Sequence, residues 1–500
     1  MPASGPPHRA SNGAAARDLI ALAAPAIAGQ ILQTGVIYAD RVMLGHADPG
    51  ALAAMQLAGP IEWTLASVSS AFAVGTLALV GRAVGAGDRE GARRHTTLAL
   101  IVALVVGAIV AVVARALVLP ALPAAFPNAS HAPNGALAFA SAYLEIALFA
   151  APFYCVGVAG MSAMSAAGDT VTPLAIGIAV NLVHVAVNWL LIGGHLGAPP
   201  LGVRGAAIST TASYALEALL TLAMLLRTDR AATLRPRLRP LFDARGRSAL
   251  GALARLSGPA YLEKLVYHTG YLAFVWMIAR LGDDAMAANQ TLIAIESLSF
   301  MTVEGFATAG AARVAQALGA RRAAEAQRLG WIATALAVVT LSSFGLLFVA
   351  LRHVLPAIVT PRADLQATAA NALFVVGLAQ PFMAAGVVLG QAGRGAGATR
   401  EVMWVSVACG FGVRLVAAWC TTAVLHYGVA GIWMGSTFDW ASRTLILAVL
   451  WRSGRLLRAR PVTASRRGFQ RSTRPRRRRG GRPSAAVGAR APSAGQRALA

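Results

Sequence analysis

The stretch 330–351, GWIATALAVVTLSSFGLLFVAL, is an apolar segment without a single charged side chain. As an α-helix that rises about 1.5 Å per residue, it is long enough to cross a hydrocarbon layer of about 30 Å. Similar runs recur along the chain, and they are longer than the roughly ten-residue alternating strands of an outer-membrane barrel. Because backbone groups in lipid must be hydrogen-bonded within the chain, we expect these runs to be transmembrane helices.

The composition of the whole chain is typical of a membrane protein. Of the 500 residues, 57% are hydrophobic and 13% are charged, whereas soluble domains have about 25% charged residues. Cys155, Cys409 and Cys420 lie in or beside apolar runs, at spacings that form neither a disulfide framework nor a zinc site. The sequence therefore predicts an all-α membrane protein without a metal or a cofactor.

Breaks between the apolar runs predict twelve transmembrane helices. They cover 18–44, 51–81, 94–119, 136–164, 171–194, 203–227, 248–280, 285–315, 326–352, 365–393, 401–425 and 428–452. Arginines concentrate in the connections on the side of the N-terminus, and basic loops are typical of the cytoplasmic side of a membrane. Both termini are therefore expected in the cytoplasm.

The chain also contains an internal repeat. At an offset of 234 residues, identical residues superpose, among them Pro25 on Pro259, Gln56 on Gln290 and Gly85 on Gly319; further along, an offset of 229 places Gly168 on Gly397. Each unit has an even number of spans, so both units enter the membrane from the same side. The sequence predicts two parallel six-helix lobes, an N-lobe (17–227) and a C-lobe (248–452), related by an axis along the membrane normal.

Three segments lie outside these lobes. Residues 1–16 form an N-terminal cytoplasmic tail, and 228–247 form an Arg-rich cytoplasmic linker. Residues 453–500 hold 14 of the 44 basic residues and no acid. Because Pro, Gly, Ser and Ala dominate the rest of this segment, we expect a disordered tail near anionic lipid and no binding of nucleic acid.

Motifs of soluble enzyme classes are missing from the sequence. Lys264 is the single lysine and follows Glu263, so the chain contains no Gly-Lys-Ser/Thr phosphate loop. The HExxH motif of zinc proteases is absent, and residues 393–398 match a relaxed dinucleotide motif only within a short connection between two helices. The protein is not expected to be an enzyme.

Polar side chains inside the predicted spans are the candidate functional residues, because a charge within lipid costs about 2.5 to 3.5 kcal/mol on insertion scales. Asp40 lies on the first helix, and Gln33 lies two turns earlier on the same face. The fifth helix carries Asn181, His184 and Asn188 at i, i+3 and i+7, which form one polar stripe. A carboxylate facing this stripe can hold a proton or a small cation, although His184 is also typical of a hydrogen-bonded core histidine.

A second set of polar residues lies in the C-lobe. Glu263 and Tyr267 share a helix face at i and i+4. Together with Glu296 and with Gln33 of the first helix, they are expected to line a substrate cavity that attracts cations. Glu296 and its repeat partner Glu62 are equally compatible with bracing the two lobes.

Two further positions limit the site. Asp40 superposes on Phe274 in the repeat, so a proton- or cation-binding group around Asp40 is confined to the N-lobe. Asp439 and Arg443 lie at i and i+4 on the last helix, a spacing that predicts a structural ion pair.

An ordered set of short motifs resembles the multidrug and toxic compound extrusion (MATE) family of transporters over about residues 17–452. The motifs follow the helix that contains residues 25–40, and they are VMLG (42–45), ALAAMQ (51–56), VGRAVGAGDREGARR (80–94), AAGDTVTP (166–173), GVRGAAIST (202–210), RLGDDAMAANQ (280–290), IESLSF (295–300) and VAQALGARR (314–322). The resemblance implies a V-shaped, monomeric antiporter of the bacterial inner membrane. It would export small organic cations in exchange for protons or sodium.

The resemblance also implies roles for individual residues. Carried over by position, Asp40 is the coupling acid of the N-lobe, surrounded by Asn188, His184 and Thr210, and Glu263 is a C-lobe acid. Members that couple through the N-lobe often have Asp where Asn188 stands and Asn where His184 stands, which leaves the ion open. A single acid beside a histidine suits a proton better than sodium, which prefers several oxygen ligands.

The alternative function is a flippase of the same superfamily for lipid-linked oligosaccharides or peptidoglycan precursors. Such a protein needs a cationic cavity for the pyrophosphate group. The bases embedded in the spans are fewer than the acids, and they are Arg255, Lys264, Arg414, Arg443 and Arg452. Organic cations and membrane lipid are therefore the expected partners.

Overall fold

Every regular element in the described part of the chain is a helix. The computed structural model describes residues 11–47, 49–126, 132, 135–227, 234–236 and 244–458. Residues up to Arg460 form one compact unit. The predictions for the two tails and the linker fall largely outside the described residues.

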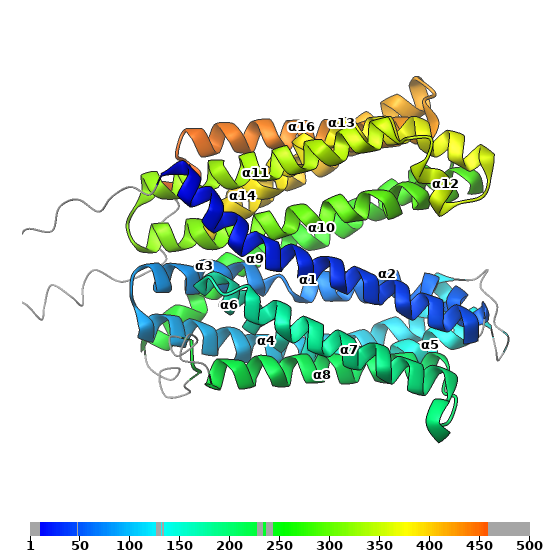
Figure 1. Ribbon diagram of the computed structural model, residues 1–500, viewed down its shortest axis with the longest axis horizontal. Coiled ribbons are helices and arrows are strands. Elements are labelled where there is room, and N and C mark those ends of the chain that lie inside the picture. Colours follow the sequence, from blue (N-terminus) through cyan, green and yellow to red (C-terminus); the bar gives the residue numbers. More distant parts are fainter. Residues whose placement is uncertain are drawn as a thin grey trace, which may run out of the picture. The chain divides into compact units, whose positions relative to one another are not determined.

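The first half of the chain forms a series of helices that run roughly parallel (Figure 1). They are α1 (Asn12–Ala47), α2 (Pro49–Ser69), α3 (Phe72–Gly85), α4 (Arg89–Ala125), α5 (Ala136–Ala147), α6 (Ala151–Ala167), α7 (Val171–Gly193) and α8 (Val203–Arg227). α2 and α3 are two parts of one broken span. α5 passes through a short 3-10 turn into α6, where Pro152 lacks the backbone N–H that would continue regular α-helical bonding.

The second half follows the same plan. Its helices are α9 (Ala244–Ala279), α10 (Asp283–Gly319), α11 (Ala323–Ala350), α12 (Leu355–Val359), α13 (Ala363–Gly395), α14 (Thr399–Val407), α15 (Val416–Trp419) and α16 (Gly428–Arg452). α14 and α15 belong to one span, because π-helical turns at Ala408–Leu415 and Cys420–Val424 continue the helix without a break.

Taken as continuous spans, these elements make twelve long helices in the described residues, and the all-α membrane architecture is confirmed. Ten of the spans are long and apolar enough to cross a membrane by themselves. The other two are α9, with Glu263 and Lys264, and α16, with Asp439 and Arg443. The charged side chains of these two helices therefore need partners inside the protein.

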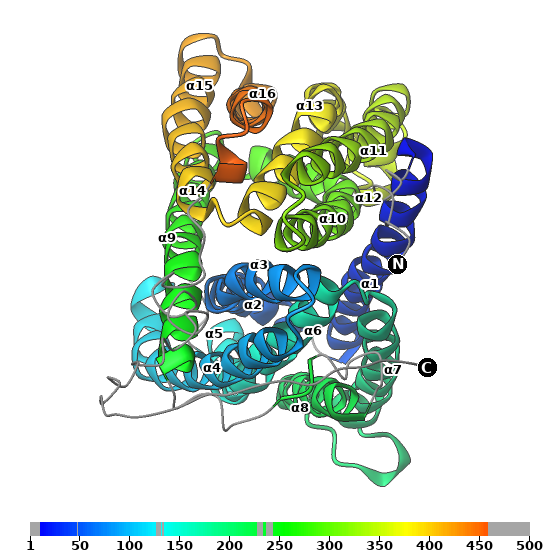
Figure 2. The ribbon, with the colours of Figure 1, turned by 90° about the vertical axis from the view of Figure 1, so that its left-hand side faces the viewer.

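The packing of the helices follows the sequence repeat. α1 packs against α7 of its own half and against α10 of the other half. Its repeat partner α9 packs in the same way against α14 of its own half and against α3 of the other half. Figure 2 shows α1 and α9 on opposite sides of the unit, each lying along both halves. Two helices are thus shared between the lobes that the sequence predicts.

α3 and α10 cross near their C-terminal ends, where repeat-equivalent residues touch. A Cβ atom on Gly81 would lie 2.8 Å from the Cβ of Ala315, its partner at the offset of 234. A residue and its own repeat partner can meet only close to the axis that relates the repeats. Since both helices reach this point with their C-terminal ends, the two copies run parallel and are not inverted.

Two glycines allow the close approach at this α3–α10 crossing. A Cβ atom on Gly85 would lie 1.9 Å from the carbonyl oxygen of Gln316. The repeat-equivalent contact is formed by Gly319, where a Cβ atom would lie 2.1 Å from the carbonyl oxygen of Arg82. Small residues are typical of closely packed membrane helices, and these two contacts allow no side chain at all.

Side chains from the crossing hold the neighbouring loops. The Arg82 guanidinium donates to the carbonyl of Ala396, which follows α13. Gln316 Nε2 donates to the carbonyl of Ala166 near the end of α6, at 2.7 Å. Each half therefore binds the backbone at the C-terminal end of a helix of the other half, and the crossing joins the two halves at one end.

Candidate functional site

The candidate site is built on α1 and α7, which pack side by side. Asp40 lies in the last third of α1, and its side chain remains 26% exposed. His184 and Asn188 are one turn apart on α7, so both side chains leave the same face of the helix. Both are buried, whereas the neighbouring Leu182 and Val183 are exposed. The polar stripe of α7 therefore faces the protein interior.

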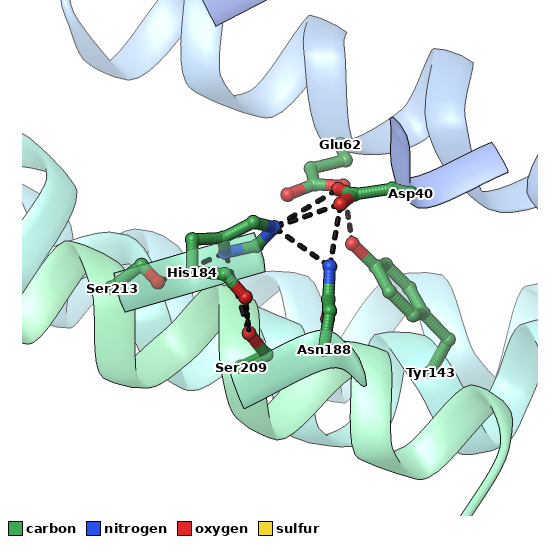
Figure 3. A network of polar contacts seen from close by, with 7 residues as sticks. All are labelled: Asp40, Glu62, Tyr143, His184, Asn188, Ser209 and Ser213. Atoms are coloured by element: carbon green, nitrogen blue, oxygen red, sulfur yellow. Dashed lines mark hydrogen bonds and ion pairs between the residues drawn. The ribbon is translucent and has the colours of Figure 1, made fainter. Parts of the chain in front are cut away.

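A triangle of short contacts joins these three residues (Figure 3). His184 Nε2 lies 2.9 and 3.1 Å from the two carboxylate oxygens of Asp40. Asn188 Nδ2 donates to Asp40 Oδ1 at 2.5 Å and lies 3.0 Å from His184 Nε2. The Asp40 carboxylate is thus bound by nitrogen groups from two sides.

Two serines of α8 complete the surroundings of His184. Ser213 Oγ lies 2.9 Å from His184 Nδ1. Ser209 Oγ donates to the His184 carbonyl at 3.1 Å and lies 3.4 Å from Nδ1. A hydroxyl can donate or accept, so Ser213 is compatible with either tautomer of His184. The imidazole can therefore exchange a proton on Nε2 without losing its partner on Nδ1.

A second acid lies beside this triangle. Glu62 of α2 accepts a hydrogen bond from the Tyr143 hydroxyl at 3.0 Å, and its carboxyl group lies next to that of Asp40 in Figure 3. Thr210, which was expected around Asp40, hydrogen-bonds to Tyr143. It is therefore linked to the site through Tyr143 and Glu62. Two carboxyl groups close together favour proton binding, because both resist being charged at once.

The sequence did not single out three members of this group, which are Tyr143, Ser209 and Ser213, and it did not place Glu62 beside Asp40. Ser209 and Ser213 lie at i and i+4 on an apolar helix, a signal of the same kind as that of His184 and Asn188. Glu62 is the repeat partner of Glu296 and was assigned either to bracing or to binding. Tyr143 gives no signal in the sequence, because a tyrosine in an apolar helix is common.

Asn181, a predicted member of the coupling group, and Gln33, which was expected in the substrate cavity, lie apart from the Asp40 contacts. Asn181 is half-buried on α7, and Gln33 is exposed on α1. Among the described contacts, neither side chain forms a hydrogen bond with Asp40, His184 or Asn188. The polar stripe of α7 is thus used at its C-terminal end, where α1 brings its carboxylate.

The C-lobe acids lie in a different environment from the one expected for an open cationic pocket. Glu263 forms an ion pair with Arg394 of α13, and the two side chains are 12% and 17% exposed. Glu296 is half-buried and interacts electrostatically with Arg414. The expectation that these acids attract cations is therefore weakened, because bases of the chain itself lie next to them.

Asp439 is fully buried and is bound by two arginines. Arg443 donates to it at 2.8 Å, and Arg414 lies 3.0 Å from its other oxygen. The predicted pair of Asp439 and Arg443 is thus confirmed, and Arg414 is an additional member. Lys264 also has a polar partner, since it donates to Ser67 Oγ at 3.1 Å.

Exposed aromatic side chains lie between the two polar regions. Trp63 of α2 is 47% exposed and Tyr267 of α9 is 43% exposed, with ring centroids 6.3 Å apart. Trp63 also contacts His268 at a centroid distance of 4.6 Å. Because Trp63 follows Glu62 in the sequence, this aromatic surface begins directly beside the N-lobe acids. Aromatic faces attract organic cations.

Comparisons with known proteins find one family model and relatives that are named multidrug resistance proteins. The MatE family model matches residues 25–190 and 259–420, once in each half of the chain. A probable multidrug resistance protein NorM of Thermotoga maritima is 25% identical over 453 residues, which are 90% of this chain and 95% of the relative. The multidrug resistance protein NorM of Burkholderia vietnamiensis is 28% identical and covers 87% of this chain and 93% of its own length.

Solved structures show the same fold. The MATE transporter VcmN of Vibrio cholerae superposes with a TM-score of 0.82 at 18% identity, over 91% of this chain and 99% of that one. A transporter of the MOP superfamily from Pyrococcus furiosus superposes with a TM-score of 0.78 at 20% identity, over 88% and 96% of the two chains.

Proposed function

This chain belongs to the MATE family, and we propose that it exports organic cations in exchange for protons by alternating access, with Asp40 as the residue that couples the two. That it is a multi-pass membrane protein and a multidrug efflux transporter follows from the family and from its NorM relatives. The contacts and charges around Asp40 support the choice of ion, the substrate class and the role of this residue.

The observation that carries the proposal is the Asp40 triangle. Asp40 lies on a helix that packs against both halves of the chain, and its carboxylate contacts His184 and Asn188. A change in the charge of Asp40 therefore alters the contacts between α1 and α7. Protonation of Asp40 can therefore change how the two lobes pack against each other.

Proton transfer is balanced within the triangle. When Asp40 is ionised, His184 Nε2–H donates to the carboxylate, and Ser213 donates to Nδ1. When a proton binds at Nδ1, which then donates to Ser213, the Nε2 proton passes to Asp40, whose O–H donates back to Nε2, and Asn188 still donates to Oδ1 of the carboxyl group. One proton is gained, and the number of hydrogen bonds is conserved.

The same carboxylate attracts a cationic substrate when it is ionised. Asp40 keeps 26% exposure, Glu62 lies beside it, and Trp63 and Tyr267 provide exposed aromatic faces nearby. Protonation removes the negative charge and with it the attraction. A proton and an organic cation thus compete for one group, which is the exclusivity that an antiporter requires.

The ligand chemistry favours a proton over sodium. Sodium requires several oxygen ligands, whereas the groups that approach Asp40 most closely are the nitrogens of His184 and Asn188. Within the described residues, no three His, Cys, Asp or Glu side chains are grouped as metal ligands would be.

The charges support organic cations over the pyrophosphate-bearing substrates of a flippase. Of the bases embedded in the C-lobe, Arg394 pairs with Glu263, and Arg414 and Arg443 share Asp439. Such pairing leaves little positive charge for an anionic substrate. Asp40 and Glu62, in contrast, face each other with His184 as the nearby titratable base.

The orientation proposed for the chain follows its arginines. Arg89 and Arg93 in the first turns of α4 and Arg322 just before α11 lie at the end of the unit where α3 and α10 cross, and basic residues at helix ends and in short loops are typical of the cytoplasmic side. We place both termini in the cytoplasm and the chain in the inner membrane of a bacterium as a monomer. The crossing then closes the cytoplasmic end, and Asp40, about 33 Å along α1 from Asp18, lies towards the outer side.

The proposal is tested by drug efflux from energised vesicles that contain Asp40→Asn at wild-type expression. With a proton gradient and no sodium, we expect efflux to be abolished, because the amide keeps the size of the side chain but cannot change charge. Asp18→Asn is the matched control, since it makes the same chemical change on the same helix at an acid that is 53% exposed. Undiminished efflux by Asp40→Asn, or efflux driven by sodium alone, would contradict the proposal.

A further inference from the structure

Glu217 of α8 is an acid inside a membrane span that the proposed mechanism does not use. It is half-buried, and within the described part of the chain no base forms an ion pair with it. Glu263, in contrast, pairs with Arg394, and Asp439 is bound by two arginines. An ionisable group inside a membrane protein usually pairs with another charge or lies on an ion or proton pathway. We propose that Glu217 is a second proton-binding residue of the N-lobe, an inference that rests on the proposed proton exchange at Asp40.

Polar residues at steps of four follow one face of α8 from the Asp40 triangle to Glu217 and beyond. Ser213, Glu217 and Thr221 lie at i, i+4 and i+8, so successive members are neighbours one turn apart. Ser213 Oγ lies 2.9 Å from His184 Nδ1, and the stripe therefore begins at the triangle (Figure 3). Glu217 is the first group after Ser213 on this stripe that can store a proton.

The neighbouring helix α6 leaves room for the two side chains that follow Ser213. A Cβ atom on Gly157 would lie 2.5 Å from Glu217 Oε1, and one on Gly160 would lie 2.1 Å from Cγ2 of Thr221. The carboxyl group thus lies in the contact between α6 and α8. Thr221 is fully buried, and its Oγ1 has no hydrogen-bond partner among the described residues. Because buried polar groups are normally hydrogen-bonded, this hydroxyl marks a place for a water molecule one turn from Glu217.

The titratable groups that face this part of α8 include no lysine and no arginine. Tyr214 lies three residues before Glu217, and its ring centroid is 5.2 Å from that of Tyr154 on α6. Both tyrosines interact electrostatically with Glu217. The remaining titratable groups that reach the stripe or these tyrosines are Cys155 of α6, Tyr143 of α5, His184 of α7, Asp40 of α1 and Glu62 of α2. None of these groups is a permanent cation that would hold Glu217 in an ion pair.

Glu217 lies between the Asp40 triangle and the end of the unit where α3 and α10 cross. Gln316 of α10 binds the carbonyl of Ala166 near the end of α6, so α6 runs towards the crossing. α8 runs parallel to α6, because the two glycine contacts follow the same order along both helices. Four residues of an α-helix span about 6 Å. Glu217 is therefore displaced by this length from Ser213 towards the crossing.

The proposed step moves one proton from the triangle to Glu217. Asp40 returns its proton to His184 Nε2, and His184 Nδ1–H gives its proton to Ser213 Oγ. The Ser213 hydroxyl passes its own proton to a carboxylate oxygen of Glu217 through one water molecule that bridges the turn. Asp40 ends ionised and Glu217 ends protonated, while His184 changes its tautomer and Ser213 is unchanged. The Asp40 carboxylate is then free to attract a cation.

The test measures efflux of tetraphenylphosphonium in water and in heavy water, from energised vesicles that contain the full-length protein. For Glu217→Gln we expect a maximal rate that is about a hundredfold lower, the smallest loss typical of a missing proton-transfer group, with an unchanged KM. The ratio of the rates in water and heavy water should increase, because proton transfer becomes the slow step. Binding of tetraphenylphosphonium to the purified variant, measured by calorimetry, should equal that of the wild type.

Glu145→Gln is the matched control, since it makes the same chemical change at an N-lobe acid that is 57% exposed. It should leave the rate and the isotope ratio unchanged. Wild-type efflux by Glu217→Gln would overturn the proposal. A slow variant with an unchanged isotope ratio would overturn it as well, because that result assigns a structural role. Loss of tetraphenylphosphonium binding would contradict it and would place Glu217 in the substrate site.

Ser213→Ala interrupts the same path without removing a charge. The same increase in the isotope ratio is expected, and a normal ratio would overturn the proposal even if Glu217→Gln did not fold. Failure of the proposed function gives a different result, because it appears as undiminished efflux by Asp40→Asn.

Discussion

His184 differs from a core histidine that only fills space, because both of its ring nitrogens have polar partners. Nε2 meets Asp40 at 2.9 Å and Nδ1 meets Ser213 at 2.9 Å. Histidine is the side chain that exchanges protons most readily near neutral pH. At the scale of single residues, the proposed mechanism therefore includes the imidazole as a second group that can carry a proton, in direct contact with Asp40.

This arrangement predicts the behaviour of His184→Gln. The glutamine amide can donate to Asp40 but cannot exchange a proton, so the pH profile of efflux should lose one of two coupled ionisations. We expect about a tenfold lower efflux rate at neutral pH, equivalent to one hydrogen bond to a charged group. Initial efflux rates measured between about pH 5 and 8 check this. His195→Gln, which changes a histidine in the turn after α7, should keep the wild-type profile, and an unchanged profile in His184→Gln would remove the imidazole from the mechanism.

The ion pair between Glu263 and Arg394 predicts a loss of stability rather than of cation binding. Glu263→Gln leaves the Arg394 guanidinium largely buried without its partner, which should cost about 3 kcal/mol of unfolding free energy. Thermal unfolding in detergent measures the effect. The double variant Glu263→Gln with Arg394→Gln removes both charges and should recover most of the stability. If the double variant is no more stable than the single one, the pair does not brace the C-lobe.

At the scale of elements, the α3–α10 crossing is the contact that the proposed alternating-access mechanism requires to open. Gly81 and Ala315 lie on the repeat axis, and no large side chain separates the two helices there. The crossing is held by backbone contacts and by the side chains of Arg82 and Gln316. Opening of the cytoplasmic end then requires α3 and α10 to part at their C-terminal ends.

A disulfide across this contact tests that requirement. Gly81→Cys and Ala315→Cys bring two Cβ atoms to 2.8 Å at the closed crossing, which is about 1 Å shorter than the separation of about 3.8 Å in a disulfide, so the bond forms once the two helices shift slightly apart. In a background in which Cys155, Cys409 and Cys420 are replaced by alanine, oxidation should abolish efflux, and a reductant should restore it. Each single-cysteine variant serves as a control and should be insensitive to oxidant. Full efflux by the cross-linked protein would mean that the crossing stays closed during transport.

At the scale of the whole molecule, the transport machinery ends with the last helix. The final described turn, Leu456–Arg458, is anchored by Leu456, which is fully buried. The residues beyond it lie outside the described part of the chain, and their sequence is rich in arginine and poor in apolar side chains. The tail is thus separable from the unit that contains the Asp40 site.

Truncation after Arg458 should therefore leave efflux unchanged. The comparison is made at equal amounts of protein in the membrane, because loss of the basic tail can alter insertion without altering transport. Efflux is measured under the same proton gradient for the truncated and the full chain. A truncated protein that reaches the membrane normally but transports at less than about a tenth of the wild-type rate, a change of about 1.4 kcal/mol in the barrier, would assign a transport role to the tail.

The sequence alone determined the number of spans, their duplication and the parallel relation of the two copies. The length of each apolar run is set by the thickness of the membrane, and a duplication remains readable in residues such as Pro25 and Pro259. The sequence also placed Asp40, His184 and Asn188 together as candidates, because a polar stripe on an apolar helix requires a partner inside the protein.

The tertiary structure decided which polar groups actually meet. The contacts of Glu62 with Tyr143 and of Glu263 with Arg394 join helices that are far apart in the chain. Such contacts depend on how each helix is rotated about its axis and shifted along it relative to its neighbours. Neither the rotation nor the shift can be read from the residue pattern of a single helix. Repeat-equivalent acids therefore acquired different partners: Glu62 lies beside Asp40 in the N-lobe, and Glu296 lies near Arg414 in the C-lobe.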